Sequence, residues 1–287
     1  MTGASGYIGS MITEFAIEEG YDVYSLSRTE KSDAKLTSLG PVPVRGELSS
    51  LDVLRRESSQ AQIVLHLADA WGFSTGMDYQ EALRIDAAAV DAMGESLHGT
   101  GKPLVVTSGT LVVGPDPTGA ETTESTPPWQ TPLNDRIRAE QNALQMCEKG
   151  VQLCAIRRGE SGIRLFMQMS VNNGEVIYVN DGGTRTSTVH SDDAARLFLA
   201  KAGDDFNGTS STDVTARQMA EAMGSALNLS VRSLTFEETA SKIGELLATF
   251  LSAENRASNA KAIRELGWQP REPGIPEVIR TGQAANY

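Results

Sequence analysis

Apolar and polar positions follow two alternating rhythms along the first half of the chain. In residues 8–19 the apolar side chains recur at helical spacing, which predicts an amphipathic helix that ends at Gly20. Short, nearly continuous apolar runs follow, and such runs are typical of strands that are buried on both faces of a parallel sheet. These predicted strands cover residues 22–27, 42–45, 62–68, 104–108 and 151–157.

Helical patterns separate the later strands, at residues 78–98 and 134–148. The order of strand, helix and strand predicts an α/β fold with a doubly wound parallel sheet. After residue 160 the rhythm weakens, with one predicted strand and three predicted helices, at 175–179, 191–202, 215–227 and 236–250. We therefore expect a larger domain over residues 1–160 and a smaller region over 161–287, with 184–202 returning to the larger domain.

A glycine-rich loop opens the chain and leads directly into the first predicted helix. Glycines let the backbone turn sharply and approach a pyrophosphate closely, and the start of a helix offers free N–H groups and a favourable dipole. The loop therefore predicts a dinucleotide site. Its predicted cofactor contacts are Gly3, Ser5, Gly6, Tyr7, Ile8 and Gly9.

The strand that should precede such a loop is reduced to Met1 and Thr2. In a doubly wound sheet this strand lies at the centre. Three explanations stay open: a truncated gene model, another segment or chain in the slot, or a rearranged sheet that has left nucleotide binding behind. We expect the slot to be closed, by collapse of the flanking strands or by a strand supplied from elsewhere, because apolar side chains would otherwise line a wet gap.

The end of the second strand indicates which nucleotide the site prefers. An NAD site usually has a carboxylate there, whereas this strand ends in Ser27, Arg28 and Thr29. Arg28 could pair with a 2′-phosphate, so we favour NADP over NAD, with no cofactor at all if the glycine loop is displaced. The remaining predicted cofactor contacts are Glu47, Leu48, Leu67, Ala68 and Thr107.

The composition limits the classes of partner that the protein is expected to bind. A net charge of -12 argues against nucleic acid or anionic membrane, and leaves a small-molecule substrate as the expected partner. The two cysteines suggest neither a disulfide framework nor a metal site, and a cytoplasmic protein follows weakly. No apolar run approaches the roughly 20 residues of a membrane span. A homodimer is compatible with the sequence.

These landmarks together resemble the extended or atypical short-chain dehydrogenase/reductases, the NAD-dependent epimerase/dehydratase family. The matching segments run in family order along nearly the whole chain: residues 2–9, 46–48, 64–68, 105–110, 139–141, 189–196 and 266–270. The resemblance implies a Rossmann domain with a small substrate-binding C-terminal part. It also implies a Ser or Thr after the fifth strand and a Tyr-x-x-x-Lys pair, which move a proton while the nicotinamide moves a hydride.

This chain departs from the family at that catalytic set. The Ser/Thr position falls on Gly109, and alignment on Glu140 puts Pro132 and Arg136 at the tyrosine and lysine positions. Arginine is not a practical proton donor at neutral pH, although it can stabilise a developing oxyanion. The candidate catalytic residues are therefore Ser108, Thr110, Arg136 and Arg138.

Other polar residues near the predicted strand ends have less specific expectations. We interpret His66, and His190 with Asp193, as structural, and His98 as a surface residue. Residues 114–133 are expected to form a loop over the site. The pocket candidates without assigned roles are Asp69, Trp71, Asp116 and Glu124, and no spacing suggests a metal site.

Three functions remain open at this stage. The first is an NADP(H)-dependent oxidoreductase that acts on a small carbonyl or alcohol. The second is a non-redox enzyme on the same scaffold, such as an isomerase, cyclase or lyase. The third is a non-catalytic NADP-binding protein. Fold alone does not decide among them.

Overall fold

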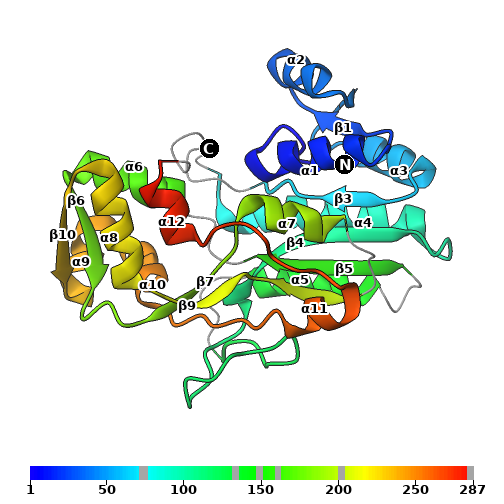
Figure 1. The fold of residues 1–287 in the computed structure, drawn as a ribbon. Helices are drawn as coiled ribbons and strands as arrows, with labels where there is room; N and C mark the ends of the chain where they lie inside the picture. The colour runs from blue at the N-terminus through cyan, green and yellow to red at the C-terminus, as the bar shows by residue number, and fades with distance from the viewer. Residues whose placement is uncertain (71–76, 131–135, 147–150, 159–162, 200–203, 283–287) are drawn as a thin grey trace. The chain divides into compact units, whose positions relative to one another are not determined.

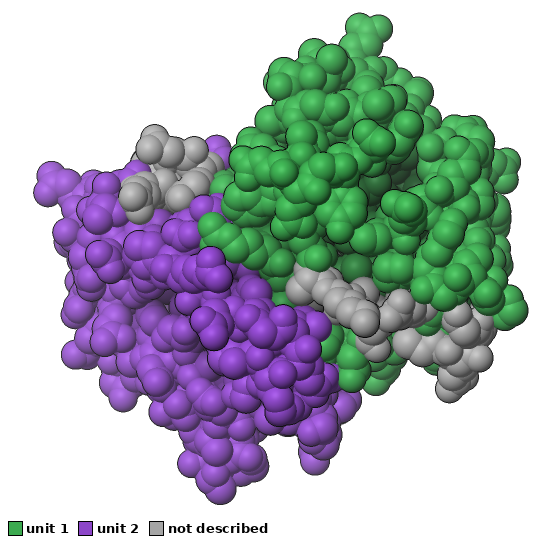
Figure 2. Space-filling view, turned by 45° about the vertical axis from the view of Figure 1, so that its right-hand side comes forward, with its two compact units in different colours: residues 1–108, 134–157, 194–206 green, residues 109–133, 158–193, 207–287 purple. Residues whose placement is uncertain are grey.

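The computed structural model describes residues 1–70, 77–130, 136–146, 151–158, 163–199 and 204–282, which form two compact units (Figures 1 and 2). Unit 1 comprises Met1–Ser108, Asn134–Arg157 and Ala194–Phe206, and unit 2 comprises Gly109–Leu133, Arg158–Asp193 and Asn207–Tyr287. The chain passes between the units several times, whereas the sequence predicts one boundary near residue 160 and one return.

Parallel strands form the framework of unit 1. A four-stranded sheet has the order β3-β4-β5-β8, and β1 pairs in parallel with β2 (Figure 1). The strands are β1 (Tyr24–Ser27), β2 (Val42–Arg45), β3 (Val64–His66), β4 (Pro103–Gly109), β5 (Gln152–Arg158) and β8 (Asp205–Gly208). The predicted α/β class with a Rossmann-like parallel sheet is confirmed.

Helices α3 (Leu51–Gln60) and α4 (Tyr79–Leu97) pack against one another beside this sheet. The apolar stripe of α4 recurs at helical spacing, and its buried members meet side chains from β3 and β4 in one hydrophobic cluster. The buried residues of that cluster include Leu54, Val64, Ala89, Met93, Leu97, Leu104 and Val106. This core fixes the carboxyl ends of β3 and β4, where the candidate site begins.

Two shorter helices border the glycine loop and the end of β1. Helix α1 (Tyr7–Glu18) begins immediately after Gly6, and helix α2 (Glu30–Leu39) follows β1. The apolar pattern did not predict α2, which is mostly polar and buries Leu36. Its start is set by a capping box, in which Thr29 and Ser32 exchange side-chain and backbone hydrogen bonds.

Met1 and Thr2 occupy the position of the reduced first strand. The amide of Leu26 in β1 donates to Met1 O, while Thr2 N donates to Leu65 O and Leu67 N donates to Thr2 O. Two residues therefore bridge β1 and β3 at the end of the slot nearest the glycine loop.

Neither of the two expected ways of closing the slot is seen among the described residues. They show neither pairing of β1 with β3 nor another strand between them. The side chains of Tyr24, at the start of β1, and Ile63, just before β3, stay 53% and 40% exposed. The physical reason is that Met1 and Thr2 themselves form hydrogen bonds to both flanking strands, including one from the Met1 ammonium to Tyr24 O, and so occupy the place that a collapsed or supplied strand would fill.

Unit 2 combines two small sheets with a helical layer. Strand β6 (Glu175–Val179) pairs in parallel with β10 (Ser230–Leu234), and β7 (Arg185–Thr188) pairs antiparallel with β9 (Ser211–Thr215). Helices α6 (Ile163–Asn173), α8 (Ala216–Leu227) and α12 (Ile275–Arg280) cover β6 through a second hydrophobic core. The buried members of that core are Val176, Met219, Ala220, Ala222, Met223, Ile275 and Ile279.

The predicted helix over residues 236–250 is two helices, α9 (Phe236–Ile243) and α10 (Glu245–Ser252). Gly244 separates them with a φ of 93°, a conformation that favours glycine. The remaining elements are η1 (Thr110–Val112), α5 (Arg136–Leu144), α7 (Ser191–Phe198) and α11 (Ala260–Leu266). Of the described helices, none has both the length and the apolar character needed to span a bilayer.

Candidate nucleotide-binding site

The glycine loop forms a tight turn in unit 1, immediately before helix α1. Gly3 has a φ of 75°, and a Cβ placed on it would lie 2.7 Å from Ala68 N. A Cβ on Gly9 would lie 2.1 Å from Gly3 O. Gly6 is the N-cap of α1 and supplies no side-chain cap, so the first amides of the helix stay available to an anion. That the loop holds a dinucleotide stays a prediction, and its tight turn is compatible with it.

Thr2 connects the loop to the end of β3, where Leu67 and Ala68 lie. Its Oγ1 accepts hydrogen bonds from the amides of both residues at 3.2 Å, and it lies 2.8 Å from His66 Nδ1. His66 is buried and its backbone oxygen accepts a hydrogen bond from Thr107 Oγ1 at 3.3 Å. These contacts place His66 in the support of the loop.

The end of β1 carries a cation that other groups do not neutralise. Arg28 is exposed, and among the described residues its guanidinium forms no hydrogen bond or ion pair. The hydroxyl groups of Ser27 and Thr29 both contact Ser32 at the start of α2. The two hydroxyls that flank Arg28 are therefore already bonded at the start of α2.

Two further cations lie near this end of unit 1. Lys35 of α2 donates from Nζ to Ser5 O at 2.7 Å, so it is directly beside the glycine loop. Arg45, at the end of β2, is paired with Asp33. Lys35 can therefore add positive charge at the loop, whereas Asp33 offsets the charge of Arg45.

The predicted contacts Glu47 and Leu48 differ in their surroundings. The Leu48 side chain is part of the hydrophobic core, so any contact with a nucleotide would come from its backbone. The exposed Glu47 carboxylate accepts a hydrogen bond from Ser49 at 2.7 Å.

Ser108 is the candidate catalytic residue with an unused hydroxyl. It lies near the end of β4, is 5% exposed, and its Oγ has no hydrogen-bond partner. A buried hydroxyl without a partner is costly, which points to a bound water or ligand at this position. Asp69, at the neighbouring end of β3, is exposed.

Thr110 has a different environment in unit 2. It is 2% exposed, and its Oγ1 accepts a hydrogen bond from Asn255 Nδ2 at 2.7 Å. Asn255 is itself held through its backbone by Arg185 and Ser187. The sequence did not point to Asn255, because no motif links positions so far apart in the chain.

The candidate arginines lie on α5. Helix α5 begins at Arg136, whose side chain lies outside the described residues, as do Pro132 and Trp71. Arg138 is exposed. The role of either arginine stays a prediction.

The loop over residues 114–133, which we expected to cover the site, forms hydrogen bonds through its described residues with other segments of unit 2. Thr122 N donates to Arg256 O at 2.8 Å, and the Arg256 side chain donates to Gly119 O at 2.6 Å. Glu124 accepts the Asn207 amide at 2.8 Å. Hydrogen bonds from the Thr118 hydroxyl and amide lower the pKa of the Asp116 carboxyl. These contacts favour structural roles for both acids over the expected pocket roles.

The segment around His190 anchors the C-terminal part of unit 2. Asp193 is fully buried and accepts hydrogen bonds from the amides of Arg271 and Glu272, and its backbone oxygen accepts one from Trp268 Nε1. His190, Asp192 and Glu272 each have one nitrogen or oxygen atom that could bind a metal ion, and these three atoms lie within 4.8 Å of one another. The spacing of these residues in the sequence does not reveal this arrangement. His190 Nδ1 already accepts the Asp192 amide at 3.2 Å, so this cluster is first a hydrogen-bonded junction.

Comparisons with known proteins agree with this architecture. The model of the NAD dependent epimerase/dehydratase family matches residues 1–157. An uncharacterized protein of Schizosaccharomyces pombe is 32% identical over 94% of this chain and 94% of its own length.

Solved structures are similar at lower identity. UDP-glucose 4-epimerase from Thermotoga maritima, solved with UDP-glucose, has a TM-score of 0.76 at 16% identity over 97% of this chain and 95% of its own. The dTDP-glucose 4,6-dehydratase DesIV from Streptomyces venezuelae, solved with NAD and TYD, has a TM-score of 0.75 at 18% identity, covering 99% and 96%. These likenesses show the fold. The family model that matches residues 1–157 shows that this chain belongs to the NAD-dependent epimerase/dehydratase family.

Proposed function

We propose that this protein is an NADP(H)-dependent oxidoreductase that acts on a small carbonyl or alcohol. The observation that carries the proposal is Arg28, an exposed guanidinium without a partner among the described residues, at the strand end where an NAD site would have a carboxylate. A guanidinium matches a phosphate in both charge and geometry.

The residues around the glycine loop fit a dinucleotide phosphate. Gly3 and Gly9 hold the loop in a conformation that a side chain would disrupt, and the start of α1 leaves its amides uncapped. Lys35 adds a cation beside Ser5. When bound, the nicotinamide would supply or accept the hydride.

The protein's own contribution to the chemistry would come from Ser108. Its buried hydroxyl can donate a hydrogen bond to the substrate oxygen and so stabilise the charge that develops there. The proton that this oxygen gains on reduction must come from water or another group, because an arginine at the family's lysine position cannot supply it.

The direct test is nucleotide binding, measured by calorimetry with NADPH and with NADH. Replacing Arg28 with Ala should weaken NADPH binding by at least about tenfold, since a charge-assisted hydrogen bond contributes about 1.5–3 kcal/mol, and should affect NADH much less. Arg56→Ala, which removes another arginine of unit 1 that pairs with Glu57, is the matched control and should leave both affinities unchanged. An equal effect of Arg28→Ala on both nucleotides would refute the NADP assignment.

A non-redox enzyme or a non-catalytic NADP-binding protein is the second candidate. The observation in its favour is that no tyrosine occurs between Tyr79 and Tyr178, so the family's usual proton donor is absent. Turnover of a panel of carbonyl compounds with NADPH would support the oxidoreductase. NADPH binding without turnover would favour the non-catalytic protein, and no NADPH binding would favour the non-redox enzyme.

A further inference from the structure

The side chains of Thr2 and His66 meet in a buried part of unit 1, next to the glycine loop. Thr2 is 2% exposed and His66 is 5% exposed, so both depend on hydrogen-bond partners inside the protein. Thr2 Oγ1 lies 2.8 Å from His66 Nδ1, and the amides of Leu67 and Ala68 both donate to Thr2 Oγ1 at 3.2 Å. Three hydrogen bonds therefore meet at this one hydroxyl group.

The number of lone pairs on the hydroxyl oxygen decides the direction of the bond between Thr2 and His66. A threonine hydroxyl has one hydrogen to donate and two lone pairs with which to accept. The Ala68 amide uses one lone pair, and the Leu67 amide, which is shared with Thr2 O at 3.3 Å, reaches the other. Among the described residues, His66 Nδ1 is the acceptor that remains for the hydroxyl hydrogen.

This direction fixes the position of the proton on the imidazole ring. A ring nitrogen that accepts a hydrogen bond carries no proton, so His66 must carry its proton on Nε2. With a proton on Nδ1 instead, Thr2 Oγ1 would face three donors and its own hydrogen would be buried without an acceptor, which is costly. Thr107 Oγ1 donates to His66 O at 3.3 Å and so fixes the backbone of this residue from β4.

The same hydroxyl sets the position of the glycine loop. Gly3 follows Thr2 directly, and a Cβ placed on Gly3 would lie 2.7 Å from Ala68 N, the amide that Thr2 Oγ1 binds. If the Thr2 side chain turned away, the Ala68 amide would lose its acceptor and the loop would no longer be fixed to the end of β3. The uncapped amides at the start of α1 would then lose their fixed position as well.

We propose that His66 is a positioning residue of the nucleotide site. Its unprotonated Nδ1 accepts the Thr2 hydroxyl hydrogen, and this bond holds Thr2 and Gly3 in the orientation that the phosphates of a dinucleotide need. The inference rests on the proposed function for the identity of the ligand, whereas the hydrogen bond itself depends only on unit 1. The sequence predicts only a structural role for this histidine, and the geometry adds a role in nucleotide affinity.

The first measurement is the ¹⁵N NMR spectrum of the histidine side chains in the full chain, without nucleotide, at about pH 8, where an unperturbed histidine is neutral. The His66 signals should be those of an unprotonated Nδ1 and a protonated Nε2. Thr2→Val removes the hydroxyl and should shift the His66 signals, while those of the exposed His98 should stay unchanged. A proton on Nδ1 of His66 would overturn the proposal, whatever the protein binds.

Paired substitutions separate the hydrogen bond from the packing. Asparagine and leucine have the same branched shape, but only asparagine can place an acceptor near the position of Nδ1. His66→Asn should therefore bind NADPH about tenfold more tightly than His66→Leu, equivalent to about 1.4 kcal/mol. Thr2→Ser, which keeps the hydroxyl, should likewise bind NADPH more tightly than Thr2→Val. Equal affinity within both pairs would overturn the positioning role.

Failure of the proposed function gives a different result. If the wild-type chain bound no NADPH, the proposed function would fail, and deuterium exchange of the Gly3 and Ala68 amides would test the bond in the same variants. Exchange should be faster in Thr2→Val than in Thr2→Ser, and in His66→Leu than in His66→Asn, because the loop loses its attachment to β3. Equal exchange within both pairs would show that the bond does not hold the loop.

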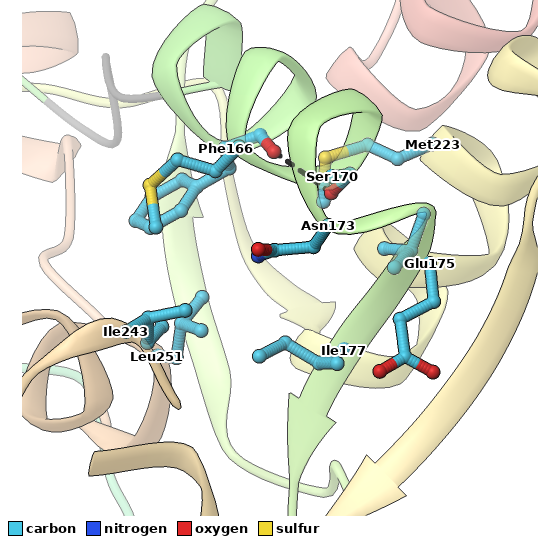
Figure 3. A pocket seen from close by; sticks show the side chains of 10 residues that line it. Phe166, Ser170, Asn173, Glu175, Ile177, Met223, Ile243 and Leu251 are labelled. Atoms are coloured by element: carbon cyan, nitrogen blue, oxygen red, sulfur yellow. Dashed lines mark hydrogen bonds between the residues drawn. The ribbon is translucent and has the colours of Figure 1, made fainter. Parts of the chain in front are cut away.

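Buried hydroxyl groups of unit 2 provide the controls. Ser170 Oγ donates to Phe166 O at 2.8 Å within α6, as the dashed line in Figure 3 shows. Thr239 Oγ1 donates to Thr235 O at 2.8 Å within α9. Ser170→Ala and Thr239→Val each remove a hydroxyl hydrogen bond outside unit 1, and should leave NADPH binding and the His66 signals unchanged. A loss of NADPH affinity as large as that of Thr2→Val in these controls would overturn the positioning role, because general stability would explain both.

Discussion

Replacing Gly9 with Ala tests how tightly the glycine loop is packed. Gly9 lies inside α1, where an alanine would ordinarily stabilise the helix by about 0.5–1 kcal/mol. Here the added Cβ would lie 2.1 Å from Gly3 O and 2.8 Å from Ala4 Cα. Both atoms belong to the backbone, so the loop must retreat by roughly 1 Å or more to restore ordinary carbon contacts.

The clash should outweigh the gain in helix propensity. Overpacking costs about 1–3 kcal/mol, so we expect a net loss of stability and a lower melting temperature. A displaced loop would also lose charge-assisted hydrogen bonds to the pyrophosphate, and NADPH binding should fall by at least about tenfold. Circular dichroism and calorimetry measure the two effects.

Gly274→Ala is the control for the Gly9 experiment. Gly274 has a φ of -63°, and a Cβ placed on it meets no atom within 4 Å. Because Gly274 is the N-cap of α12, this variant should lower the melting temperature slightly, by less than Gly9→Ala does, and should leave NADPH binding unchanged. If Gly9→Ala behaved in the same way as Gly274→Ala, the close approach of Gly9 to Gly3 would be wrong.

Three other predictions follow from contacts described above. Asp193→Asn should lower the free energy of unfolding by about 3 kcal/mol, because buried amides lose a charged acceptor; a loss below ~1 kcal/mol by urea unfolding would contradict the assigned role. Burial lowers the pKa of the Met1 ammonium to about 6, so the unfolded state binds more protons between pH 6 and 8 and stability should rise with pH in that window; a flat profile would argue against it. Adding an apolar segment of about six residues before Met1 should cover Tyr24 and Ile63, raise the melting temperature and NADPH affinity, and abolish the Met1 pH dependence; no change in these would mean that the slot accepts no strand.

Local patterns predicted much of the fold. Residues 42–45 and 175–179 form the strands β2 and β6 as predicted, because β-branched and apolar runs bounded by turns are local signals. The polar helix α2 was missed because its start depends on capping by Thr29 and Ser32 and not on an apolar stripe. The spacing of apolar residues predicted one helix where α9 and α10 are two, because that spacing carries no information on the φ of Gly244.

The site was predictable only where a motif is continuous in the sequence. The glycine loop lies within nine residues, and a Cβ placed on Gly3 would lie 2.7 Å from Ala68 N. The partner of Thr110 is Asn255, which is 145 positions away, and no local pattern connects them. For the same reason, sequence placed Glu124 in a pocket, whereas the structure uses it to hold the distant Asn207 amide.

The bridge formed by Met1 and Thr2 has a consequence for local unfolding. In the described part of unit 1, the backbone hydrogen bonds between the β1–β2 pair and β3 all run through these two residues. A segment held by so few hydrogen bonds can open as one cooperative unit, at a free energy well below that of global unfolding. Amides of β1 and β2 should therefore exchange with deuterium faster than those of β4. A nucleotide bound between Arg28 and the glycine loop would slow that exchange, so part of its binding energy would be spent in closing this half of the sheet.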